Sequence, residues 1–258
     1  MAVRTILTYL LIAIAAGFAG AVAAADADEL RTGYFRLEMT PVEMVGAANA
    51  ESLAETLPPD EPVSWQLYVP PAYDPANPPG VVVFVSSIRR GGPPRAWNPT
   101  LEEHNLIWIG ANGDGSKINA TVRILKAIIA PFALRQDYVV DFSRSYIAGY
   151  ADGGRIATMV MTARPEQYKG GVYLGAADAW DEVPAKIDLI RENRHAFVVG
   201  TNDPRLKDRL RAFSSFKSAG VDNADLIKIH NWANRFPPPE YFGKAIDYLD
   251  AEREADAD

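Results

Sequence analysis

The sequence contains no cysteine, which excludes disulfide bonds, thiolate metal sites and a cysteine nucleophile. Histidine is scarce: the three copies are widely separated along the chain and have no spacing typical of a metal site. Basic residues number 26 against 33 acidic ones, and a net charge of −7 argues against a nucleic-acid partner, which requires a basic surface. We therefore expect no metal, no other cofactor and no nucleic acid.

One long apolar run lies at the N-terminus. It follows Arg4, extends over residues 6–18 and ends in the small residues 21–25, directly before an acidic stretch. This three-part layout is typical of a secretory signal peptide. We expect residues 1–25 to be a leader, the protein to be periplasmic or secreted, and no stable membrane insertion after cleavage. The alternative is an uncleaved anchor, because residues 5–25 approach the roughly 20 residues needed to span a bilayer.

Without the leader, about 230 residues remain, which suits one α/β domain with a sizeable core. Residues 26–62 are expected to form an N-terminal strand, at 34–39, and an irregular acidic segment; 63–252 form the main domain, and 253–258 a polar tail. The main domain alternates strands with helices, which predicts a mostly parallel central sheet with helices on both faces. A ligand site is expected at the carboxyl ends of its strands. Pro131 is expected to kink or divide the helix predicted at 118–135. The predicted strands are 63–69, 80–85, 106–111, 146–148, 171–175, 196–200 and 226–229, and the other predicted helices are 155–163, 205–219 and one that starts after Pro237-Pro238.

The segment SYIAGYADGGR, residues 145–155, has an unusual centre. An apolar strand runs into a glycine-framed turn and a helical pattern follows, which is the layout of the nucleophile elbow, G-x-S-x-G. Gly149 and Gly153 occupy the two glycine positions, so Ala151 stands where the motif has serine. Alanine has no atom that can attack a carbonyl, and the segment therefore argues against nucleophilic catalysis at this turn.

Four segments together resemble secreted α/β-hydrolases, in particular esterases akin to polyhydroxybutyrate depolymerases and feruloyl esterases. They are Val81–Ser87, Leu106–Asn112, the elbow, and Pro237–Phe242, and the resemblance extends over residues 63–250. It implies an α/β-hydrolase fold.

The same resemblance identifies three catalytic positions. Members of the family have serine where this chain has Ala151, and their acid lies in a Gly-x-x-Asp turn that Asp203 matches. Their histidine precedes the proline-rich start of the last helix, and aligning Pro237-Pro238 places Asn234 there. A base that shuttles protons must be titratable, and an amide is not. The resemblance thus implies a hydrolase scaffold with a degenerate triad.

Two functions remain open at this point. One is a pseudo-hydrolase that binds a small acyl or anionic ligand or a partner protein. The other is an active carboxylic ester hydrolase with relocated groups, in which Ser86, Ser87 or Asp152 attacks and His230, at the end of the last strand, acts as base. The sequence decides neither enzymatic activity nor oligomeric state.

A second set of residues is predicted to bind a ligand. Ser86 and Ser87 follow a central strand, where family members have the oxyanion loop; Arg89 and Arg90 supply positive charge, and the backbone N–H of Asp152 lies at a helix N-terminus. The alternative interpretations are turn-forming serines, solvated arginines, and an Asp152 carboxylate placed to favour the helix dipole. Asp203 and His230 likewise have structural alternatives, as a helix cap and as a strand-end residue.

Overall fold

The computed structural model describes residues 30–233 and 235–251. The predicted leader, Asn234 and the predicted polar tail, 253–258, lie outside the described residues. Within the described part, no helix is long and apolar enough to cross a membrane.

The core of the protein is one eight-stranded sheet with the strand order β1-β2-β4-β3-β5-β6-β7-β8. Strands β3 to β8 pair in parallel, whereas β2 is antiparallel to β4 and β1 is antiparallel to β2. The predicted, mostly parallel sheet is thus confirmed. The strands are β1 (Gly33–Met39), β2 (Val63–Val69), β3 (Gly80–Val85), β4 (Leu106–Ala111), β5 (Ser145–Tyr150), β6 (Gly170–Leu174), β7 (Arg194–Gly200) and β8 (Ala224–Ile229).

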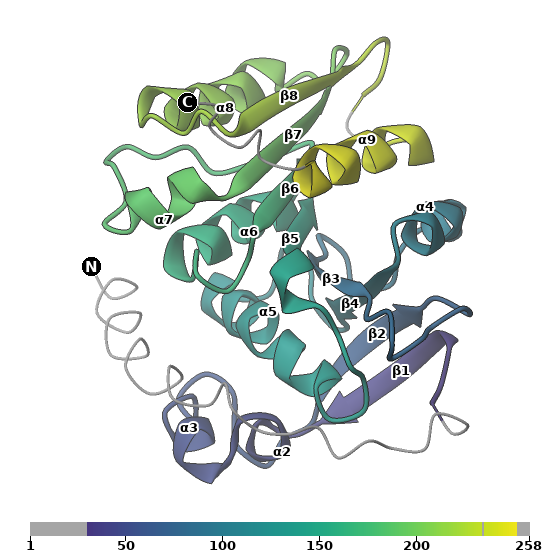
Figure 1. Cartoon of the computed structure of the whole chain (residues 1–258). Coiled ribbons are helices and arrows are strands. Elements are labelled where there is room, and N and C mark those ends of the chain that lie inside the picture. Colours follow the sequence, from purple (N-terminus) through teal and green to yellow (C-terminus); the bar gives the residue numbers. More distant parts are fainter. Residues whose placement is uncertain (1–29, 234, 252–258) are drawn as a thin grey trace, which may run out of the picture.

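Helices cover both faces of this sheet (Figure 1). On one face α5 contacts β3 and β4, and α6 contacts β3, β5 and β6; on the other, α4 contacts β4 and α9 contacts β6, β7 and β8. Both faces of the central strands are therefore buried, as their continuous apolar sequences require. The helices are α2 (Pro41–Val45), α3 (Ala47–Glu51), α4 (Asn98–Glu103), α5 (Ala120–Leu134), α6 (Asp152–Ala163), α7 (Ile187–Glu192), α8 (Leu206–Ser218) and α9 (Pro239–Asp250).

Alternation along each central strand divides the core into two layers. In β3, Val81 and Val83 pack in the layer beneath α5 and α6, whereas Val82 and Phe84 pack in the layer beneath α4 and α9. The second layer is rich in aromatic rings, and Trp97 stacks on Phe242 with ring centroids 4.2 Å apart. The sheet is thus held from both sides, which fixes the positions at which its strands end.

Helix α5 is continuous through Pro131, so the predicted division of this helix is wrong. Proline has no N–H, and the carbonyl four residues earlier, that of Ala127, loses its usual donor. The Tyr168 hydroxyl supplies the missing hydrogen bond to the Ala127 oxygen at 2.9 Å, and the Gln167 side chain donates to the next carbonyl, that of Ile128, at 2.8 Å. Tertiary hydrogen bonds therefore allow the helix to tolerate the proline.

The segment 41–62, expected to be irregular, contains the short helices α2 and α3. A capping box starts α2: the Glu43 carboxylate accepts from the Thr40 N–H at 2.6 Å, and the Thr40 hydroxyl accepts from the Glu43 N–H at 3.3 Å. Met44, Leu53 and Leu57 then join the main core. This segment is therefore an integral part of the domain and forms one wall of a pocket described below.

Candidate functional site

The elbow has the backbone shape of a nucleophile elbow with a methyl group at its centre. Strand β5 ends at Tyr150, Ala151 has φ 51° and ψ −122°, and α6 begins at Asp152. The Ala151 N–H donates to the Leu174 carbonyl at 2.8 Å, which ties the turn to β6. A positive φ at a residue other than glycine is strained, and such strain is concentrated at functional turns. The strand–turn–helix geometry is present here without a nucleophilic side chain.

The glycines around Ala151 are required by close backbone contacts. A Cβ on Gly149 would lie 2.2 Å from the Gly153 oxygen, one on Gly153 would lie 2.0 Å from the Val85 oxygen, and one on Gly154 would lie 2.0 Å from the Ala176 oxygen. No side chain fits at these distances, so the start of α6 packs directly on the ends of β3 and β6.

A buried arginine, which sequence reasoning did not identify, joins two predicted site residues. Arg123 on α5 is 1% exposed; its Nη1 lies 2.5 Å from Asp152 Oδ2 and its Nη2 donates to the Ser86 carbonyl at 2.8 Å. The Asp152 carboxylate is therefore held in an ion pair. The sequence did contain a signal for the burial of Arg123. This residue precedes Ala127 by one helical turn and Pro131 by two, so the three residues share the buried face of the helix.

The two candidate serines have contacts typical of turns. Ser86 is 1% exposed, and its Oγ accepts from the Ile88 N–H at 3.2 Å. The Ser87 carbonyl accepts from the Ser116 N–H at 3.3 Å. In the described part of the chain no histidine hydrogen bonds to either serine, so neither hydroxyl has the adjacent base that would activate it.

Asp203, which matches the acid of the family, follows β7 and is 6% exposed. Its Oδ1 accepts from the Arg205 N–H at 2.8 Å, and its Oδ2 lies 3.3 Å from Arg209 Nε on α8. Asp203 therefore forms a turn two residues before the N-cap of α8, which is Arg205, and does not itself cap the helix. Among the described residues, no histidine contacts this carboxylate.

The three histidines lie in different parts of the molecule. His230 is exposed directly after β8, and none of its ring atoms forms a hydrogen bond or ion pair with the described residues. His195 is fully buried, bonded to the Tyr173 hydroxyl and the Ile190 carbonyl, and burial lowers its pKa to about 4 although the Ile190 hydrogen bond opposes the shift. His104 contacts Asp250 at the amino edge of the sheet. Within residues 30–233 and 235–251, no group of three or more acidic or histidine side chains could hold a metal ion.

Aromatic rings pack beside the elbow. Tyr150, which immediately precedes Ala151, stacks on Phe236 with centroids 4.2 Å apart, and Phe236 also contacts Phe84 and Trp97. The cavity beside Asp203 measures about 10 Å³, close to the minimum for one water molecule. That cavity has no room for an acyl chain.

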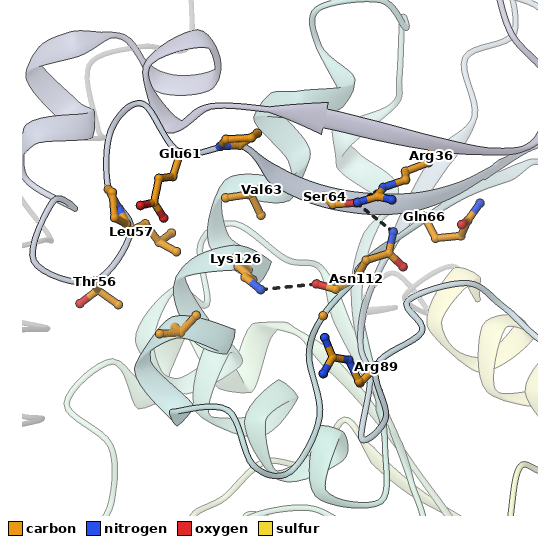
Figure 2. Close-up of a pocket in the computed structure, with 14 residues that line it drawn as sticks. Arg36, Thr56, Leu57, Glu61, Val63, Ser64, Gln66, Arg89, Asn112 and Lys126 are labelled. Carbon is orange, nitrogen blue, oxygen red and sulfur yellow. Dashed lines mark hydrogen bonds between the residues drawn. The ribbon is translucent and has the colours of Figure 1, made fainter.

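A much larger pocket, of about 650 Å³, lies elsewhere at the carboxyl edge of the sheet (Figure 2). Of the five predicted ligand-binding residues, Arg89 lines it, whereas Ser86, Ser87, Arg90 and Asp152 do not. The pocket is formed by β1, the segment before β2, the start of β2, the loops after β3 and β4, and α5. Its lining residues are Arg36, Thr56, Leu57, Pro58, Glu61, Pro62, Val63, Ser64, Gln66, Arg89, Asn112, Gly113, Val122 and Lys126.

Comparison with known proteins shows the fold. No family model matches the sequence, and no curated protein matches it significantly. Among solved structures, the chain is similar to an S-formylglutathione hydrolase from Staphylococcus aureus, with a TM-score of 0.62 and 12% identity over 85% of this chain and 99% of that one. It is also similar to Est1E from Butyrivibrio proteoclasticus (TM-score 0.52, 16% identity, 72% of this chain and 91% of that one) and to Est2, an esterase from Thermogutta terrifontis (TM-score 0.51, 17% identity, 73% of this chain and 87% of that one). The chain has the α/β-hydrolase fold, with alanine at the centre of its elbow.

Proposed function

We propose that this protein is a non-catalytic member of the α/β-hydrolase fold class that acts by binding a small acyl or anionic ligand or a partner protein. The observation that carries the proposal is the Ala151 methyl group at the strained centre of the elbow. A nucleophile elbow accelerates hydrolysis through the side chain at that position, and a methyl group cannot form an acyl intermediate.

The contacts of the other candidate groups support the same proposal. Asp203 is paired with Arg209, His230 has no carboxylate partner among the described residues, and Asp152 is paired with Arg123. A general base needs a partner that orients it and a nucleophile within hydrogen-bond reach. Several side chains would have to change partners before this edge could transfer a proton.

The retained fold supports a second candidate, an active carboxylic ester hydrolase with relocated groups. It would use Ser86, Ser87 or Asp152 as nucleophile and His230 as base. The burial of Ser86 weighs against this residue, since an attacking group must be accessible to substrate, and Asp152 is already engaged in its ion pair with Arg123.

Hydrolysis of p-nitrophenyl acetate and butyrate distinguishes the two candidates. The purified protein is assayed beside the Asp203→Ala and His230→Ala variants, with buffer and the heat-denatured protein as controls for uncatalysed release. We expect a rate near that of the controls that neither substitution changes. Turnover far above the controls that falls in either variant would replace the binding proposal with the relocated hydrolase.

We also propose that the protein is exported by its N-terminal leader. The support is the sequence pattern of residues 1–25. Fractionation of cells that express the full chain with a C-terminal tag, followed by N-terminal sequencing, tests export. We expect a processed protein in the periplasm or medium; a full-length protein in the membrane fraction would support the anchor instead.

A further inference from the structure

The pocket of about 650 Å³ has the size of a small-molecule site and contains none of the elbow residues. One wall is apolar and is made by Leu57, Pro58 and Val122. Glu61 lies beside this apolar surface, and the side of the pocket across from it, which includes Arg36 and Arg89, is polar and positively charged (Figure 2). The pocket is therefore amphipathic, with separate places for an apolar body and a charged head.

Three cationic side chains line the pocket, and of these only Arg89 has no partner among the described residues. Arg36 lies 2.5 Å from Glu38, and Lys126 lies 3.2 Å from Asp114. The Arg89 guanidinium has no hydrogen bond or ion pair with any described residue, and it is exposed to the pocket (Figure 2). A guanidinium offers five N–H donors in a planar fork that matches a carboxylate. One positive charge in the pocket is thus available to a ligand.

The hydroxyl of Ser64 provides a second observation of the same kind. Ser64 Oγ already accepts hydrogen bonds from Arg36 Nε at 2.7 Å and from Asn112 Nδ2 at 3.1 Å. Neither of these bonds uses the proton of the Ser64 hydroxyl, and among the described residues that proton has no acceptor at hydrogen-bond distance. The pocket is thus lined by a hydroxyl whose proton lacks an acceptor and by an unpaired guanidinium, with Asn112 between the two (Figure 2), and each favours a ligand with acceptor oxygens.

The carboxylate of Glu61 limits the ligand to one negatively charged group. Glu61 lies across the pocket from Arg89 (Figure 2). A second negative charge on the ligand would approach this carboxylate and be repelled. A phosphate, which carries about −1.5 to −2 charges at neutral pH, exceeds the single unpaired cation.

From these observations we propose that the pocket binds a small organic monocarboxylate, with its carboxylate at Arg89 and its apolar part on Leu57, Pro58 and Val122. This inference rests on the binding half of the proposed function and not on the absence of catalysis. Ligand affinity and ester turnover are measured separately, so each can fail alone.

Isothermal titration calorimetry with hexanoate tests the site, with 1-hexanol as the uncharged probe and adipate as the doubly charged one. We expect saturable hexanoate binding, weaker binding of both other probes, and affinity for hexanoate that falls about tenfold in Arg89→Gln, since a charge-assisted hydrogen bond is lost. Arg90→Gln is the matched control, because Arg90 is the adjacent exposed arginine and does not line the pocket. The Arg89 side chain supports no described contact, so its substitution is expected to leave the melting temperature unchanged.

Ser64→Ala provides a second variant and is expected to weaken hexanoate binding by a smaller factor than Arg89→Gln. Several results would overturn the proposal: no hexanoate binding, equal loss in the two arginine variants, or hexanol binding as tight as that of hexanoate. Adipate or inorganic phosphate binding as tightly as hexanoate would overturn the assignment to monocarboxylates.

Discussion

The elbow and the pocket lie at the same carboxyl edge of the sheet and differ in how their polar groups are used. At the elbow, Asp152 and Asp203 are each paired with an arginine, and the cavity beside Asp203 measures about 10 Å³. At the pocket, about 650 Å³ is open and Arg89 has no partner among the described side chains. The elbow has the backbone shape associated with catalysis, but its central side chain is a methyl group and both nearby carboxylates are paired. The pocket has an unpaired arginine but no elbow residue in its lining.

This difference separates two sources of information. The elbow shape depends on glycines and backbone contacts, which are needed for the sheet and α6 to pack whether or not the protein is an enzyme. Binding and catalysis depend instead on side chains whose hydrogen-bond donors or charges are not already paired within the protein. Fold likeness therefore says little about activity at this edge, and activity must be argued from the side chains.

The largest expected effect comes from breaking the glycine frame of the elbow. Gly153→Ala places a Cβ about 2.0 Å from the Val85 carbonyl oxygen, a backbone atom that cannot move aside. We expect a loss of about 3 kcal/mol in the free energy of unfolding, measured by urea denaturation. Gly243→Ala is the control, because its Cβ would lie 3.6 Å from Thr100 Cγ2, an ordinary contact inside α9. Equal stability of the two variants would show that the frame is not structurally required.

The Arg123–Asp152 pair tests whether the charges at the elbow serve stability. Arg123→Met leaves the Asp152 carboxylate and the Ser86 carbonyl without their buried donor. Because Asp152 is partly exposed, we expect a loss of about 2 kcal/mol, below the usual range for a fully buried pair. The double variant Arg123→Met/Asp152→Asn should recover part of this loss, since no charge is left unpaired. A double variant less stable than the single variant would contradict this account.

Backbone strain at the elbow predicts a stabilising substitution. Ala151 has φ 51°, a region that glycine adopts without steric cost. Ala151→Gly should raise the free energy of unfolding by about 1 kcal/mol, after allowance for the greater chain entropy of glycine. Ala148→Gly, in the buried part of β5, should have the opposite sign. If both variants are destabilised alike, the turn is not strained.

The smallest effect on the free energy of unfolding is expected for His104, at the opposite, amino edge of the sheet. This edge has no predicted ligand-binding residue and serves as a reference. A hydrogen bond to Asp250 raises the pKa of His104, and burial only partly offsets it. Burial opposes the charged form of Asp250, but hydrogen bonds from His104, Arg144 and Tyr146 outweigh it and hold the Asp250 pKa below its usual range.

The sign of the pH dependence follows from these shifts. The raised His104 pKa contributes stability that is present below pH 6.5 and is lost as the pH rises through the folded-state value. The lowered Asp250 pKa contributes stability above pH 3.8 that is lost in stronger acid. The stability difference between wild type and His104→Gln should therefore be larger at pH 5.5 than at pH 8.5. His195 also titrates, with a lowered pKa, but its contribution is common to both proteins and cancels.

Much of the fold could be predicted from the sequence because its signals are local. The buried strands 80–85 and 106–111 are confirmed with the predicted bounds, since continuous β-branched and aromatic runs identify strands covered on both faces. The elbow was visible for the same reason: its glycines, strand and helix are consecutive. Helix α2 was missed although Thr40 and Glu43 form a capping box, because the short helix has little apolar periodicity.

The candidate sites depend on contacts between residues far apart in the sequence, so less of them could be predicted from the sequence. The partners of Asp152 and Asp203 are Arg123 and Arg209, and no spacing rule connects Arg123 on α5 with the elbow. The pocket brings together residues as distant as Arg36 and Lys126. Arg89 was predicted from the sequence as a ligand-binding cation. The residues around it could not be predicted, because the strand order and the packing of the N-terminal segment bring them together.

The central claim is that this edge of the sheet has no activated nucleophilic serine. Its most direct test is the intact mass of the protein after exposure to a fluorophosphonate. The reagent forms a stable adduct with an activated serine and hardly reacts with an ordinary hydroxyl. The account predicts an unmodified mass under conditions that fully label a serine esterase of the same fold. A stoichiometric adduct that peptide mapping assigns to Ser86 or Ser87 would contradict it.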